Sequence, residues 1–69
     1  MFVSLGNDTY VNATHISLLS GVQRSQRDAG HHQVRILLMG KHEHTQVGPE
    51  DEIKALHSRL KNALDQLGP

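Results

Sequence analysis

The chain has 69 residues, no cysteine, and seven Lys/Arg against seven Asp/Glu, so its formal net charge is zero. The lack of cysteine excludes disulfides and thiolate metal sites. The neutral balance makes nucleic acid an unexpected partner, because nucleic-acid binders gain most of their affinity from a basic face. We expect one small domain, residues 1–69, whose modest core needs close helix-on-sheet packing or a second copy.

The N-terminal segment predicts a β-hairpin over residues 2–11. Two β-prone stretches, Phe2 to Leu5 and Thr9 to Val11, flank the turn-forming residues Gly-Asn-Asp at 6–8. The stretch NATHI, residues 12–16, has Asn and Thr suited to capping one short turn. The first ten residues carry neither a basic region nor a long apolar run, so we expect no signal peptide, no membrane span and a cytoplasmic location.

The middle of the chain predicts three strands and a polar loop. In the first strand, alternate residues would share one face, namely Ile16, Leu18, Ser20 and Val22. The polar residues 26–32 then form a hairpin loop. Residues 33–39, QVRILLM, give the strongest strand signal, with Val34, Ile36 and Leu38 on one face and Arg35, Leu37 and Met39 on the other. Residues 40–41 make a turn before a last short strand at 44–47.

The C-terminal third predicts an amphipathic helix over about residues 49–67. Pro49 suits the first helical turn, and the acidic residues 50–52 favour the positive end of the helix dipole. Gly68 is expected to end the helix. Apolar residues recur at spacings of three and four, which defines one buried stripe: Ile53, Leu56, Leu60, Ala63, Leu64 and Leu67.

This order of elements predicts an α+β fold, with a small twisted antiparallel sheet of four to five short strands over about residues 1–47 and one C-terminal helix. Such a sheet could also curl into a barrel. The strand at 33–39 is apolar on both faces, and one helix can cover only one of them. We therefore expect a homo-oligomer whose interface contains Leu37, Met39 and Leu19.

Two small-molecule sites are also compatible with the sequence. His42 and His44 would project from the same strand face, about 7 Å apart, and His31 and His32 in the preceding loop could complete a zinc or copper site. The alternative is that all four are exposed turn residues. The second site is an anion-binding groove formed by basic side chains, with an ordinary solvated surface as the alternative: Arg24, Arg27, Arg35 and Lys41.

The sequence contains no nucleophile elbow, HExxH motif or phosphate-binding loop, so we expect no enzymatic activity and no cofactor. The leading expectation is a small binding or regulatory protein that acts through protein–protein contacts and self-association. The alternatives are an oligomeric binder of a small anionic or nucleotide-like ligand and a histidine-based metal-binding protein.

The order of these signals resembles the FlbD/SwrD family of small flagellar and swarming-motility proteins. The resemblance spans nearly the whole chain and rests on YVNATHI (residues 10–16), VRILLMGK (residues 34–41), Val47 and PEDEI (residues 49–53). The chain departs from the family in the long connection QRSQRDAGHH and in the histidine-bearing HEHTQ. The resemblance implies a small cytoplasmic bacterial protein that is not an enzyme and that acts through protein contacts.

Overall fold

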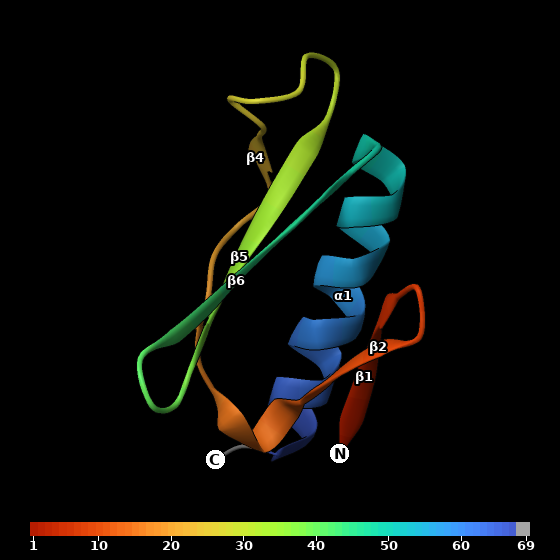
Figure 1. Ribbon diagram of the computed structural model, residues 1–69. Helices are drawn as coiled ribbons and strands as arrows, with labels where there is room; N and C mark the ends of the chain where they lie inside the picture. Colours follow the sequence, from red (N-terminus) through yellow and green to blue (C-terminus); the bar gives the residue numbers. More distant parts are fainter. Residues whose placement is uncertain (68–69) are drawn as a thin grey trace.

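The computed structural model describes residues 1–67 and confirms the α+β fold, in which antiparallel strands precede a C-terminal helix. Within these residues the strands do not close into a barrel (Figure 1). The elements follow one another in this order: β1 (Phe2–Gly6), β2 (Thr9–Asn12), the 3₁₀ helix η1 (Ala13–His15), β3 (Ile16–Leu19), β4 (Gln23–Arg24), β5 (His32–Leu38), β6 (His42–Gly48) and α1 (Glu50–Leu67).

β1 and β2 form the predicted hairpin. Its turn places Asn7 and Asp8 at φ 51° and 59°, a left-handed conformation that Asn and Asp tolerate better than most residues. The hairpin buries Val3, Leu5 and Val11 on its inner face. The predicted short turn follows as η1, where the Asn12 side chain accepts a hydrogen bond from the Thr14 backbone N–H at 3.1 Å.

β5 is the central strand of the second sheet. β6 pairs with it on one side over all seven residues, and β3 and β4 pair with it in turn on the other side. The last strand is longer than predicted, because it starts at His42 and not at His44. The turn before it is the predicted one, with Gly40 and Lys41 at φ 83° and 66°.

The predicted face of the strand at 16–22 is wrong. The pairing between β3 and β5 shifts register between Ile16 and Leu18, and an extra residue in one strand reverses the alternation of side chains beyond it. Ile16, Leu19 and Val22 therefore pack against the core, while Leu18 is about half exposed.

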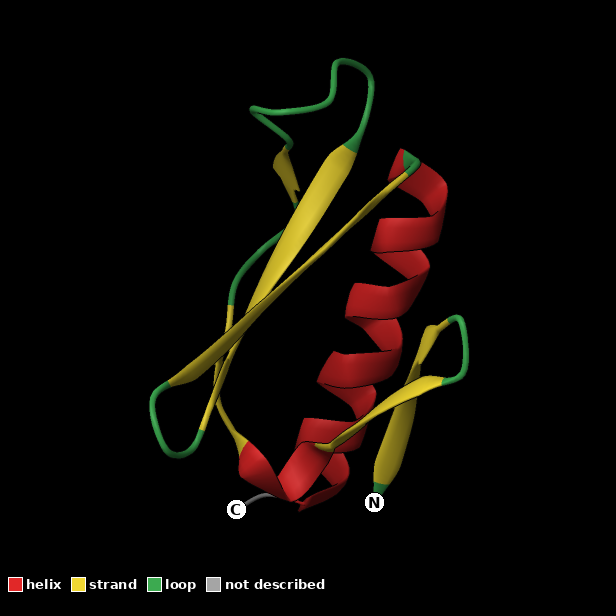
Figure 2. Ribbon diagram, in the orientation of Figure 1, coloured by secondary structure: helices red, strands yellow, loops and turns green. Residues whose placement is uncertain are grey.

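The helix α1 lies between the sheet and the hairpin, and its apolar stripe forms the centre of the core (Figures 1 and 2). Four stripe residues are buried: Ile53, Leu56, Leu60 and Ala63. They pack in one core with the inner faces of the hairpin and of the second sheet. Val34 and Ile36 of β5 belong to this core and are fully buried. Leu64 is half-buried and Leu67 is exposed, so the buried stripe is shorter than predicted. Gly68 lies outside the described residues.

Leu60 should be a main source of stability. Its side chain is 0% exposed, and truncating a buried leucine leaves a cavity, so Leu60→Ala is expected to lower the free energy of unfolding by about 2–5 kcal/mol. Leu67, on the same helix but 44% exposed, is the matched control: Leu67→Ala should change it by no more than about 0.5 kcal/mol. Urea denaturation measures both, and equal losses would show that the stripe is misassigned.

Candidate functional site

Three of the exposed large apolar side chains lie where the hairpin approaches the turn between β5 and β6. Phe2, Tyr10 and Met39 are exposed by 70%, 61% and 64%. They border one depression of about 330 Å³, here called the apolar groove, whose lining residues are Phe2, Tyr10, Val11, Asn12, His15, Leu38, Met39 and His42.

The hairpin register explains why two aromatic rings face solvent. Val3 pairs with Val11 on the inner face, so the neighbouring residues Phe2 and Tyr10 lie on the outer face. Phe2 is opposite Asn12 and Tyr10 is opposite Ser4, which makes the two aromatic residues diagonal neighbours across the strands. Since these are the Phe and Tyr of the chain, none of its aromatic side chains is used in the core.

The other wall of the groove is held by backbone contacts. The Met39 N–H donates to the His15 carbonyl at 2.8 Å, which ties the start of the β5–β6 turn to the end of η1. Met39 therefore extends from a fixed backbone toward solvent. Together with the paired strands of the hairpin, this contact gives the groove two anchored walls.

Of the residues predicted for an oligomer interface, Leu37 and Met39 are exposed, as that prediction requires. Leu19 is not available, because the register shift in β3 turns it toward the core. Leu18, which pairs with Leu37 on the outer face of the sheet, is the exposed leucine of β3. Phe2 and Tyr10 were not among the predicted site residues, although the alternation of Phe2-Val3 and Tyr10-Val11 in the predicted hairpin indicates that both face outward.

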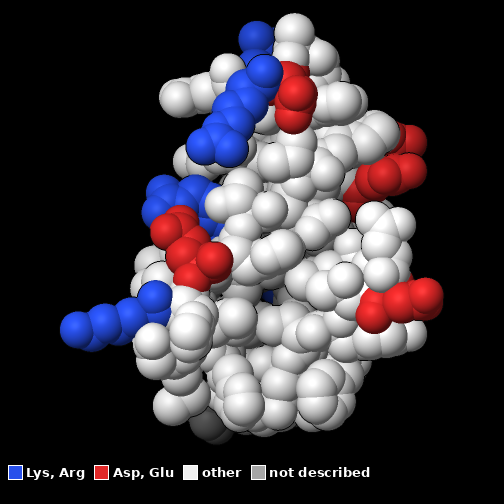
Figure 3. Space-filling view, in the orientation of Figure 1, with Lys and Arg blue, Asp and Glu red and all other residues white. Residues whose placement is uncertain are grey.

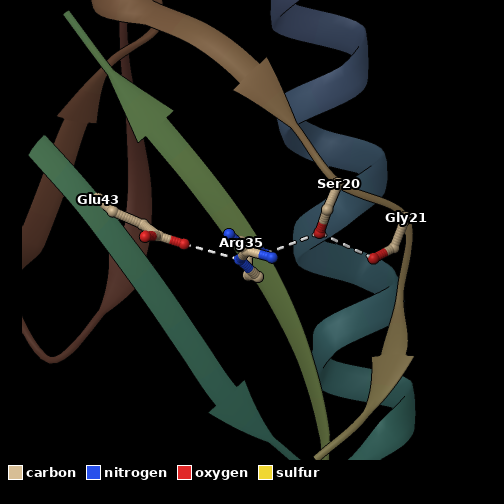
Figure 4. Close-up of polar contacts among 4 residues, drawn as sticks. All are labelled: Ser20, Gly21, Arg35 and Glu43. Atoms are coloured by element: carbon tan, nitrogen blue, oxygen red, sulfur yellow. Dashed lines mark hydrogen bonds and ion pairs between the residues drawn. The ribbon is translucent and has the colours of Figure 1, made fainter. Parts of the chain in front are cut away.

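The four basic residues predicted to bind an anion do not form one site. Arg35 is already engaged: its Nε lies 2.6 Å from Glu43 Oε1, and both side chains are about half exposed (Figure 4). Lys41 is in the turn at one end of the β5–β6 pair, whereas Arg24 pairs with His32 at the other end. Arg24 and Arg27 border different depressions.

Figure 3 also shows that the basic side chains are dispersed. They are spread along one side of this face, and acidic side chains lie beside some of them. The strand length is the physical cause. Seven paired residues extend about 20 Å, which is too far for the side chains at the two ends of β5 to share one small anion.

The predicted metal ligands are separated for the same reason. His42 and His44 do share one face of β6, opposite Leu38 and Ile36. His31 and His32 lie at the far end of β5, where His32 is opposite Gly48. Within residues 1–67, no three His, Asp or Glu side chains are arranged to hold a metal ion.

Two of the half-buried histidines have protein partners. His32 Nε2 lies 3.0 Å from Glu50 Oε2 at the start of α1, and His44 Nε2 lies 2.9 Å from Gln46 Oε1. The first contact joins β5 to the helix, and the second lies along β6.

No family model, no curated protein and no solved structure matches the chain. Within residues 1–67, no helix combines the length and the apolar character needed to cross a membrane.

A metal-content measurement tests the interpretation of the histidines. Because His31 and His32 cannot reach His42 and His44, the purified protein should contain no stoichiometric zinc or copper, and a variant with both His42→Gln and His44→Gln should give the same background value. Elemental analysis after dialysis measures this. Stoichiometric metal in the wild type that disappears in the double variant would show that His42 and His44 bind a metal ion and would contradict this interpretation.

Proposed function

We propose that this protein is a small, non-enzymatic binding protein, a regulator or adaptor, that acts through protein–protein contacts and self-association. The observation that supports this most is the apolar groove. A soluble chain that leaves its Phe and Tyr side chains and a neighbouring Met exposed at one place carries the kind of surface that marks an interaction site.

The chemistry of the groove suits a protein partner. Tyr and Phe bury a large area with few rotatable bonds, and aromatic residues and Met are enriched at protein interfaces. Met39 can adapt its shape to a partner surface. The groove also has polar groups from Asn12, His15 and His42 at its border, which can orient a bound side chain or peptide group.

The family resemblance and the expected cytoplasmic location are part of the same proposal. The resemblance to the FlbD/SwrD family implies a bacterial protein that acts by protein contacts, which agrees with a surface groove as the working site. We also place the protein in the cytoplasm. No contact in residues 1–67 favours the anion or metal alternatives, because the side chains that each requires are dispersed.

A binding comparison tests the groove. Affinity capture from cells that express the protein would identify the partner, and calorimetry on the purified pair would measure the affinity. Tyr10→Ala and Met39→Glu should each weaken binding at least about tenfold, since a loss of 1.4 kcal/mol corresponds to that factor. Both residues are exposed, so circular dichroism should show unchanged folding.

The matched control is Ser58→Glu, on an exposed position of α1 that does not border the groove, and it should bind as the wild type does. A thermal-shift screen against metals and nucleotides completes the test. A ligand present at a hundred times its Kd adds about 2.7 kcal/mol of stability. Such a shift with a nucleotide, or equal binding by the groove variants, would overturn the proposal.

A further inference from the structure

β6 presents a regular strand edge that lacks a partner within residues 1–67. It pairs with β5 on one side through seven consecutive residues and without a register shift, and no described strand pairs with its other side. An open edge of this kind carries a row of backbone N–H and C=O groups that can pair with another strand.

Two of the other strand edges carry features that oppose such pairing. The opposite edge of the same sheet is irregular, since β3 has a register shift and β4 is only two residues long. In the hairpin, the Arg59 side chain donates a hydrogen bond to the Ser4 carbonyl of β1 at 3.4 Å. β6 contains no Lys, no Pro and no bulge, which are the usual devices that protect an edge.

We propose that β6 pairs antiparallel with β6 of a second copy, with the two-fold axis at Thr45. This register is the one that pairs all seven residues of the strand. It places His42 opposite Gly48, Glu43 opposite Val47 and His44 opposite Gln46, while Thr45 meets its own counterpart. This inference specifies the self-association in the proposed function, and binding at the apolar groove does not depend on it.

The side chains of β6 are compatible with a second copy. Glu43, the one charged side chain of the strand when histidine is neutral, faces the apolar Val47 of the partner, so no like charges meet. His44 and Gln46 already lie within hydrogen-bond distance inside one chain at 2.9 Å, and the pairing would bring the same two types together across the interface. The result is one continuous sheet with both helices on the same face.

The surface area buried between the two strands indicates how tightly the dimer should form. Stable interfaces bury about 800 Å² per partner, and one seven-residue edge with its flanking side chains reaches less than this. Backbone hydrogen bonds would supply much of the affinity, as in other cases of strand addition. We expect a dimer that forms at micromolar concentration and dissociates on dilution.

A single cysteine tests the register directly, because the chain has no cysteine of its own. Residues that face each other across two antiparallel strands have Cα atoms about 4.5–5.5 Å apart, which lies within the range for a disulfide. Thr45→Cys should therefore form a disulfide-linked dimer under mild oxidation, seen on a non-reducing gel. The control Ser58→Cys, also exposed, should cross-link at least about tenfold more slowly at the same concentration.

Introducing a charge at the two-fold axis tests the strand pairing independently. Thr45→Lys would place two ammonium groups opposite each other, so sedimentation should give the 7.7 kDa chain mass at concentrations where the wild type gives twice that value. Thr45→Val, which keeps the β-branched shape, should remain dimeric. Thr45 is exposed, and circular dichroism checks that each variant is folded.

Three outcomes would overturn the strand pairing. The first is equal cross-linking of Thr45→Cys and Ser58→Cys. The second is a dimer that survives Thr45→Lys but is lost in Met39→Glu, which would place self-association at the apolar groove. A wild-type protein that stays monomeric well above micromolar concentration, and whose β6 amide signals change only when a foreign peptide is added, would assign the edge to a different partner. Partner binding by Tyr10→Ala and Met39→Glu is measured separately, so failure of one proposal is distinguishable from failure of the other.

Discussion

The packing of one helix face against two separate β units is the contact on which the rest of this structure depends. The hairpin β1–β2 and the sheet of β3 to β6 belong to different hydrogen-bonded sheets, and a two-stranded hairpin alone is at best marginally stable. Leu56 and Leu60 of α1 lie in the same buried cluster as Val3 of the hairpin and Ile36 of β5. The apolar stripe of α1 therefore joins the two units into one core.

This arrangement also determines what stays exposed. A single helix covers only the inner faces, so the outer faces of both β units remain open to solvent. On the hairpin the outer face presents Phe2 and Tyr10, and on the sheet it presents Leu18 and Leu37. Within residues 1–67 no further helix or strand covers these outer faces.

The sequence predicted the elements that rest on simple periodicity, but it did not predict how the strands are aligned. The helix follows from apolar residues spaced three to four apart, and β5 follows from apolar residues at alternate positions. The buried residues of both elements were predicted correctly, except at the C-terminal end of the helix. The position of Leu19 was wrong because a bulge in β3 depends on pairing with β5, which the local sequence does not encode. The dispersal of the four histidines, in contrast, follows from the predicted strand at 33–39, because His32 precedes one end of that strand and His42 follows the turn at the other end. The apolar groove also needed the structure, because it joins residues near both 2–15 and 38–42.

The two proposed surfaces meet at His42, and their relation has a consequence for binding. His42 is the first residue of β6 and also borders the apolar groove. In a dimer paired about Thr45, His42 of one copy lies opposite Gly48 of the other, so the two grooves would lie near opposite ends of the paired strands, about 20 Å apart along them. A partner with two binding segments at a matching separation would gain avidity from the second contact without any new interaction. A monomer would lack this gain, although each groove would still bind a single segment with its own affinity.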